Sequence, residues 1–288
     1  MDTVLASLAS RLGRLRSGPG VDGRTGAGAG EAQGEGKAEG PVLVYQMGKV
    51  GSTSVTAALS NGLGPERVAQ VHFLSERFER RARGQARYER QLAQRRRVLD
   101  LLNGEPSRRA LFVTMVRDPV ARAVSDFFEN PGIYLDPSDR LATASLDAMH
   151  DALATRAPRA FAYPAQWFDG EFRAFTGVNV LELPFDPALG YAVSRHDAFD
   201  LLILRTESMD HAFEPGMHRL LRDSPSFPVG RANAAEHKGP AGLRSRFVAG
   251  LTIDAGALEA AYANDFMRHF YAKDEIDRMR LRWAAPKA

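Results

Sequence analysis

A short apolar run in this sequence passes through a glycine-containing turn directly into a helical stretch. The run is Val42–Tyr45, the turn holds Gly48 and Gly51, and Ser52 opens a stretch with helical character that continues through Leu59. A turn of this kind leaves backbone N–H groups without internal partners, and the helix dipole adds partial positive charge at the same point. The pattern therefore predicts an anion site at the end of a strand.

The residues of this turn suit a phosphate or sulfate group. The candidate binding residues have a flexible backbone, a hydroxyl or a positive charge: Gly48, Lys49, Gly51, Ser52, Thr53 and Ser54. In the phosphate loop of nucleoside-triphosphate enzymes, the lysine follows the last glycine and precedes a Ser or Thr that binds Mg²⁺. Here Lys49 precedes Gly51, so that motif is not present.

A second candidate site follows the apolar run at residues 111–116, which is typical of a strand buried on both faces of a parallel sheet. Arg117 comes directly after this run, Asp118-Pro119 predicts the start of a helix, and Ser125 lies about two turns into it. The guanidinium and the hydroxyl could converge on one phosphate. The alternative is an arginine paired with a local carboxylate and a serine inside a helix.

Further strands are expected at residues 68–73 and 201–204, and a long charged helix at residues 74–102. Strands that alternate with helices predict an α/β fold with a parallel sheet in three layers. The folded domain is expected to span residues 41–288. Residues 1–40 are predicted to be a flexible tail, because a short amphipathic stretch is followed there by Gly-rich sequence that cannot form a core.

Composition excludes several classes of protein. There is no cysteine, which rules out disulfides, thiolate zinc sites and a cysteine nucleophile. No apolar stretch approaches the roughly 18 residues of a membrane span, and arginines interrupt the apolar positions near the N-terminus. We expect a cytoplasmic protein, with peripheral attachment to the inner membrane as the alternative. The oligomeric state is not indicated.

Positive charge is concentrated between Glu76 and Arg109, where 11 arginines face 5 acidic residues. A solvated pair of Arg-rich helices is the favoured interpretation, and an anion-binding face is the alternative. The segment lacks interleaved aromatic residues and a known nucleic-acid motif, so no nucleic acid partner is expected.

Two of these patterns resemble a known family. The order Lys-x-Gly-Ser-Thr at residues 49–53 resembles the 5′-phosphosulfate loop of sulfotransferases that use 3′-phosphoadenosine 5′-phosphosulfate (PAPS). The R-D-P…R…S pattern from Arg117 to Ser125 resembles their 3′-phosphate site. The strand ending in Arg205-Thr-Glu207 is similar to their late Arg-x-Glu strand, and residues 231–239 resemble their C-terminal nucleotide loop.

The resemblance is more specific in the second half of the chain. Residues 167–172, 177–179, 184–186 and 270–283 resemble bacterial capsular polysaccharide synthesis proteins, a sulfotransferase-like family. The similarity extends from about Val42 to Trp283. That family often has Lys-Trp-Tyr where this chain has Lys238-Gly-Pro240, a departure that concerns the adenine or acceptor contacts more than the phosphate contacts.

The resemblance implies the sulfotransferase fold and transfer of a sulfuryl group from PAPS to a hydroxyl of a carbohydrate, a capsular or cell-surface polysaccharide, or another metabolite. It implies that the donor is held by the turn residues, Arg117, Ser125, Asn233 and Lys238. A sulfuryl group carries less negative charge than a terminal phosphoryl group, so no metal is expected. A kinase-like transferase and a non-catalytic nucleotide-binding relative are the alternatives.

The reaction also needs a group to stabilise the leaving phosphate and a base for the acceptor proton. Lys49 is the candidate for the first role. His72 is the candidate base, because it ends the expected strand at residues 68–73 and so opens at the same sheet edge as the turn; the alternative is a histidine that caps the following helix. Glu129 is the second candidate base. The acceptor is expected among residues 130–195, the segment with the least regular pattern.

Overall fold

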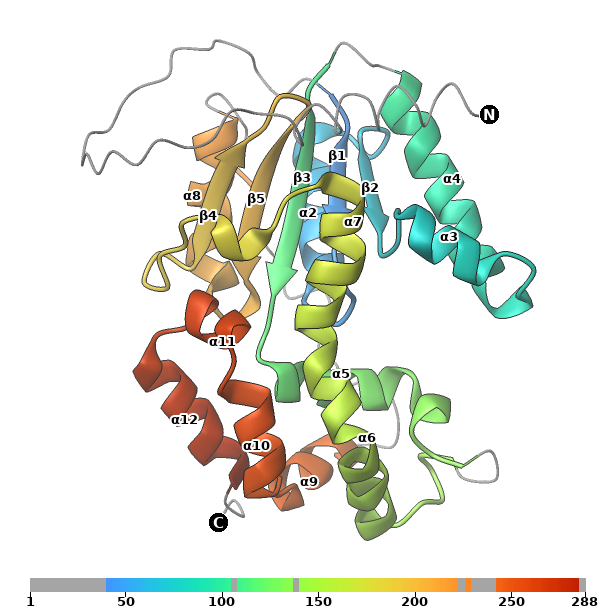
Figure 1. Ribbon diagram of the computed structural model, residues 1–288, viewed down its shortest axis with the longest axis vertical. Helices are drawn as coiled ribbons and strands as arrows, with labels where there is room; N and C mark the ends of the chain where they lie inside the picture. Colours follow the sequence, from blue (N-terminus) through green and yellow to red (C-terminus); the bar gives the residue numbers. More distant parts are fainter. Residues whose placement is uncertain (1–39, 105–107, 137–139, 222–225, 229–241, 285–288) are drawn as a thin grey trace.

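The computed structural model describes residues 40–104, 108–136, 140–221, 226–228 and 242–284 (Figure 1). The expectations for the tail at residues 1–39 and for Asn233 and Lys238 lie outside these residues.

The core of the protein is a five-stranded mixed sheet with strand order β2-β1-β3-β5-β4. Its strands are β1 (Val42–Tyr45), β2 (Val68–Val71), β3 (Ala110–Val116), β4 (Tyr191–Arg195) and β5 (Phe199–Arg205). The four expected strands are confirmed, and their pairings with one another are parallel. The expected α/β class is therefore correct.

The expectation of an all-parallel sheet is wrong at one edge. β4 pairs antiparallel with β5, with Tyr191 opposite Leu204. Only three residues join the two strands, and so short a connection permits a hairpin but not a crossover to a parallel strand. β4 was not expected at all, since its side chains are only half-buried or exposed and give no continuous apolar run.

Helices cover both faces of the sheet (Figure 1). They are α2 (Ser52–Leu63), α3 (Glu76–Ala82), α4 (Glu89–Gly104), α5 (Pro119–Glu129), α6 (Leu146–Trp167), α7 (Arg173–Thr176), α8 (Met209–Leu220), α9 (Leu243–Gly250), α10 (Ala255–Tyr262), α11 (Asp265–Phe270) and α12 (Lys273–Ala284). A five-residue π-helical turn, η4 (Phe168–Phe172), joins α6 to α7.

Aromatic side chains fill the layer between the sheet and α7, which crosses in front of the strands in Figure 1. The Tyr45 ring lies 5.2 Å from Trp167 and 5.4 Å from Phe172, and Phe112 lies 6.3 Å from Phe175. On the opposite face α8 comes so close to β5 that a Cβ at Gly216 would lie 2.7 Å from Leu202. Trp167 and Phe172 are buried core residues.

The long helix expected at residues 74–102 is interrupted. α3 ends at Ala82, a 3₁₀ turn η2 (Ala86–Tyr88) follows, and α4 begins at Glu89. Gly84 has φ +76°, a left-handed conformation that no α-helix can contain. The break turns the residues around Arg87 toward the carboxyl edge of the sheet, where they line the cleft described below.

The segment of residues 130–195 is more regular than expected, because α6 occupies 22 of its residues. Two prolines, Pro158 and Pro164, stand inside this helix and weaken its sequence pattern. No helix in the described part of the chain is both long and apolar enough to cross a membrane.

Candidate functional site

The carboxyl ends of four neighbouring strands bring the candidate residues together. Residues 46–51 follow β1, His72 follows β2, Arg117 follows β3 and Thr206 follows β5. The Thr206 hydroxyl lies 2.8 Å from the Val50 carbonyl and 3.0 Å from the Val116 carbonyl. One side chain thus ties the first turn to the ends of the two central strands.

The turn after β1 has an unusual backbone. Gly48, Lys49 and Gly51 have φ values of 87°, 64° and 84°, and Lys49 is the one non-glycine residue with positive φ among the described residues. The left-handed conformation is unfavourable for a residue with a Cβ by about 1–2 kcal/mol. Such strain is typical of functional turns, because the backbone N–H groups can then point at a ligand.

Arg117 connects the two halves of the predicted anion site. Its Nη1 donates to the Lys49 carbonyl over 2.7 Å and to the Ser125 hydroxyl over 3.2 Å. Burial lowers the pKa of Arg117, and the nearby carboxylates of Glu207 and Asp118 oppose that effect. The alternative of an arginine bound only to a local carboxylate is not what the structure shows, since the guanidinium reaches the first turn.

A third residue at this position was missed. Arg244, in the second position of α9, donates from Nη2 to the Ser125 hydroxyl over 3.3 Å. Its guanidinium also lies 5.8 Å from the centre of the Phe128 ring. Arg244 is 119 residues from Ser125 in the chain, and no motif spacing could have indicated the contact. Two arginines therefore converge on one hydroxyl.

His72 is held by the first turn of the site. Its Nδ1 lies 2.9 Å from the Gln46 carbonyl and 3.1 Å from the Gln46 side-chain Nε2. The amide orientation of Gln46 is set, because its Oε1 accepts a hydrogen bond from the Gly48 N–H. The two contacts require opposite tautomers, because the Gln46 carbonyl only accepts and the Gln46 amide N–H only donates. The shorter contact, with the carbonyl, places the proton on Nδ1 and leaves Nε2 of the ring as an acceptor.

The environment favours the neutral form of this histidine. Burial lowers the pKa of His72 from its usual value, and the positive charge of Lys49 lowers it further, although the hydrogen bond to Gln46 raises it. His72 does not cap the following helix, since the cap of α3 is Ser75, which accepts from the Phe78 N–H over 3.1 Å.

Glu129, the second candidate base, forms an ion pair with Lys49. It is the last residue of α5, and its Oε1 is 3.5 Å from the Lys49 Nζ. The two candidate bases, His72 and Glu129, therefore flank the same lysine.

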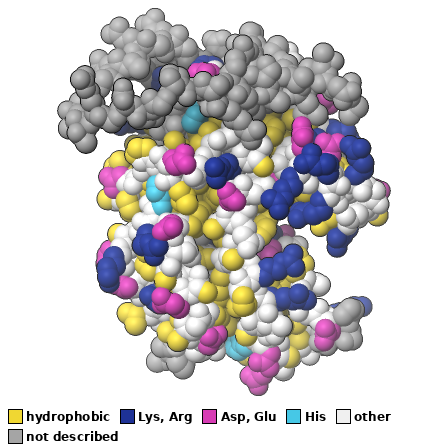
Figure 2. Space-filling view, in the orientation of Figure 1, with side chains coloured by type: hydrophobic (Ala, Val, Ile, Leu, Met, Phe, Trp, Pro, Cys, Tyr) yellow, Lys and Arg dark blue, Asp and Glu magenta, His cyan; other side chains and the backbone are white. Residues whose placement is uncertain are grey.

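These residues line one cleft of about 1490 Å³. Every described candidate contributes to its wall: Gly48, Lys49, Gly51, Ser52, Thr53, Ser54, His72, Arg117, Ser125 and Glu129. The other walls come from residues 87–94 and from α5 and α6. Figure 2 shows a hollow at the right of the molecule, with Lys and Arg side chains on both sides of it.

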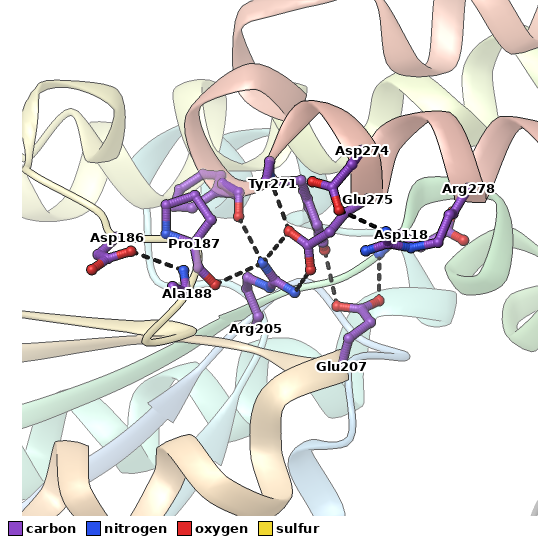
Figure 3. Close-up of polar contacts among 12 residues, drawn as sticks. Asp118, Asp186, Pro187, Ala188, Arg205, Glu207, Tyr271, Asp274, Glu275 and Arg278 are labelled. Carbon is purple, nitrogen blue, oxygen red and sulfur yellow. Dashed lines mark hydrogen bonds and ion pairs between the residues drawn. The ribbon is translucent and has the colours of Figure 1, made fainter.

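A buried polar network fixes the end of β3 behind the cleft. The Glu207 carboxylate accepts from the Asp118 N–H over 2.8 Å and from the Tyr271 hydroxyl over 3.0 Å (Figure 3). The Asp118 side chain accepts from the Tyr262 hydroxyl over 2.7 Å and from the Trp283 indole over 3.0 Å. The C-terminal helices thus brace the residue next to Arg117.

Arg205 completes this bracing. It binds the Glu275 carboxylate with both of its terminal nitrogens, at 2.8 and 2.5 Å, and reaches the Pro187 carbonyl over 3.0 Å (Figure 3). Arg205 and Glu207, the two residues of the Arg-x-Glu pattern, therefore support the site and do not line the cleft.

One protein-family model matches part of the chain. The family described as "Putative capsular polysaccharide synthesis protein" (NKWYS) matches residues 149–272. This segment runs from α6 to the end of α11 and includes Arg205 and Glu207. No curated protein and no solved structure matches the chain.

Proposed function

We propose that this protein is a PAPS-dependent O-sulfotransferase with the sulfotransferase fold, which transfers a sulfuryl group to a hydroxyl of a carbohydrate in polysaccharide biosynthesis. The observation that carries the proposal is the contact of Arg117 with both the Lys49 carbonyl and the Ser125 hydroxyl. Two anion-binding patterns found separately in the sequence meet across the ends of neighbouring strands.

The donor would bind with its two charged ends on these two patterns. The 5′-phosphosulfate would lie on the turn of residues 48–51 and the N-terminus of α2, which line the cleft and would offer it hydroxyls, Lys49 and the positive end of the helix dipole. The 3′-phosphate would lie between Arg117, Ser125 and Arg244, whose guanidinium and hydroxyl groups already converge. Asn233 and Lys238 remain proposed contacts from the sequence.

The chemistry requires one bond to form as another breaks. The acceptor oxygen bonds to sulfur, the bond from sulfur to the bridging phosphosulfate oxygen breaks, and its electron pair stays on adenosine 3′,5′-bisphosphate. The acceptor proton passes to Nε2 of His72, which the Nδ1–Gln46 contact leaves as an acceptor. Lys49 and the turn stabilise the charge that develops on the leaving phosphate, so the proposed reaction needs no metal.

Calorimetry with adenosine 3′,5′-bisphosphate and PAPS tests the donor site. We expect wild type to bind both, and Arg117→Ala to bind them about 10–100-fold more weakly, because a buried charge-assisted hydrogen bond is lost. Arg97→Ala, which removes an exposed arginine of α4 outside the cleft, should bind as wild type does. Because Arg117→Ala also loses its contact with the turn, Ser125→Ala serves as a milder second variant.

Activity is measured as transfer of labelled sulfate from PAPS to a panel of polysaccharides and small hydroxylated acceptors. A wild-type protein that binds neither nucleotide, or that binds Mg²⁺–ATP more tightly than PAPS, would contradict the proposal. If Arg117→Ala and Ser125→Ala both bind the nucleotides as tightly as wild type does, the donor site does not lie at this position.

A further inference from the structure

The cleft holds more positive charge than the proposed donor site uses. Eight of its lining residues are basic and two are acidic: Lys49, Arg87, Arg90, Arg117, Arg122, Arg156, Arg159 and Arg244, against Asp126 and Glu129. Three of the basic residues, Lys49, Arg117 and Arg244, belong to the donor site proposed above. A fourth is structural, because the buried Arg122 lies 4.5 Å from the Tyr163 ring centre and 3.6 Å from Asp126.

The four remaining arginines form two facing walls. Arg87 and Arg90 come from η2 and the start of α4, and Arg156 and Arg159 come from α6. Each pair is three residues apart, a spacing that places both side chains on one side of a helical segment. In the orientation of Figure 2, basic side chains lie above and below the hollow, where Figure 1 places α3 and α4 above it and α6 below.

These arginines differ from others in the same charged region. Arg80 of α3 pairs with Glu76 over 3.2 Å, and Arg83, directly after α3, pairs with Glu79 over 3.0 Å; the partners in each pair are four residues apart. Within the described residues none of the four cleft arginines has a carboxylate within ion-pair distance, and all four side chains are exposed. Neighbouring like charges repel, so two such pairs facing one cleft indicate a negatively charged ligand.

The size of the cleft leaves room for that ligand. Pockets for single small molecules measure about 300–1,000 Å³. A volume of about 1490 Å³ therefore exceeds what one nucleotide needs. The arginine walls and the donor site lie in the same cleft, with His72 and Glu129 also on its wall.

We propose that the acceptor is an acidic polysaccharide, whose carboxylate groups bind Arg87 and Arg90 on one wall and Arg156 and Arg159 on the other. This inference rests on the proposed function, since it names the substrate class of that site. A polymer held between the walls presents one of its hydroxyls to His72. Guanidinium groups suit this task because they bind carboxylates with two hydrogen bonds.

The test compares polygalacturonate oligomers with the same oligomers after reduction of their carboxyl groups to alcohols. Binding is measured by calorimetry for wild type, Arg156→Gln/Arg159→Gln and Arg87→Gln/Arg90→Gln. We expect wild type to bind the acidic oligomers and each double variant to bind them about tenfold more weakly, with a weaker dependence on salt. The reduced oligomers should bind weakly to every variant.

A matched control separates local from general charge effects. Arg96→Gln/Arg97→Gln removes the same charge from exposed positions of α4 outside the cleft and should leave binding unchanged. The inference fails if wild type does not bind the acidic oligomers, if the reduced oligomers bind equally well, or if the control loses as much affinity as the cleft variants. If poly-glutamate binds as tightly as the acidic oligomers and its binding depends on the same arginines, the ligand of this site is an acidic peptide and not a glycan.

Donor binding, measured on the same variants, distinguishes the two proposals. Each double variant should bind adenosine 3′,5′-bisphosphate within twofold of wild type. If neither wild type nor any variant binds this nucleotide, the sulfotransferase proposal fails. If binding of the acidic oligomers still depends on the arginines, the acidic-glycan site stands.

Discussion

The inner end of the cleft and its outer walls hold their positive charges in different ways. At the inner end Arg117 is fixed by the Lys49 carbonyl and Ser125, and the residue beside it is braced by Glu207. On the outer walls the arginines are exposed and carry no carboxylate partner among the described residues. Fixed groups suit a reacting centre, since they need no reorganisation during the reaction, whereas exposed ones suit a variable polymer.

This difference has a direct experimental consequence. Interactions of exposed charges are screened over about 8 Å at physiological salt, and partly buried ones are screened much less. Changes at the inner end should therefore alter turnover at any ionic strength. Changes on the walls should alter binding of the acceptor, and mostly at low salt.

The largest effect at the inner end is expected for His72→Ala. Removal of a general base typically costs 10²–10⁴-fold in rate, so we expect turnover to fall by about 10³-fold while affinity for the donor is kept. The measurement is sulfate transfer from labelled PAPS, together with nucleotide calorimetry. Glu129→Gln is the comparison variant. If it loses turnover and His72→Ala does not, the base is Glu129.

The pH dependence of the wild-type rate follows from the same residue. Only neutral His72 can accept the proton, and burial lowers its pKa below the usual value of about 6.5. The rate should therefore rise with pH, reach half of its maximum below pH 6.5, and be level at neutral pH. A half-maximum above pH 6.5 would contradict this assignment.

A smaller loss of turnover is expected for variants of Lys49. At this position the effect of the ammonium charge and the effect of the left-handed backbone can be measured separately. Lys49→Ala and Lys49→Gly both lose the ammonium, and we expect each to reduce turnover by about 10²-fold. Lys49→Gly should be more stable than Lys49→Ala by about 1 kcal/mol, because glycine adopts φ 64° without strain. Thermal unfolding and sulfate transfer measure the two effects.

Lys273→Ala is the control for this pair. Lys273 is an exposed residue at the start of α12, and its ammonium forms an ion pair with Asp277 of the same helix. It should leave both turnover and unfolding close to wild type. If Lys49→Ala keeps turnover within tenfold of wild type, another group stabilises the leaving phosphate.

Much of the inner end could be predicted from the sequence, because local patterns encode it. β3 is a continuous apolar run, and Asp118 caps α5 by accepting from the Val120 and Ala121 N–H groups, as its place before Pro119 predicted. The turn glycines have the left-handed conformation that their residue type permits. Each of these features depends on residues close together in the chain.

The features that were missed depend on contacts between distant segments. Arg244 meets Ser125 because α9 packs against α6 and stacks Phe247 on Phe127 of α5. β4 is an edge strand without an apolar run. The arginine-rich segment was predicted as a solvated helix pair. That is right for Arg80 and Arg83, which form ion pairs on the surface. Arg87 instead lines the cleft, and for it the alternative of an anion-binding face stays a prediction. Sequence alone did not separate these arginines.

The smallest of the expected effects at the inner end concerns Gln46, whose contact with His72 was also missed. Gln46→Glu keeps an acceptor for the Gly48 N–H but places a carboxylate next to Nδ1 of His72. A negative charge there stabilises the imidazolium and raises the pKa of His72. The fraction of neutral base then falls at a given acidic pH, so the rise of the rate should move to higher pH, with a severalfold lower rate near pH 6 and a nearly unchanged one at pH 8.

Gln166→Glu adds the same charge on the exposed side of α6, outside the cleft, and should leave the pH profile in place. A profile that does not move in Gln46→Glu, or that moves to lower pH, would show that Gln46 does not set the protonation of the base. If the pH profile moves in Gln46→Glu and not in Gln166→Glu, the contact with Gln46 controls the protonation of His72. The base is then held by hydrogen bonds in the same way as Arg117 is. Replacement of the wall arginines should leave the same profile unchanged.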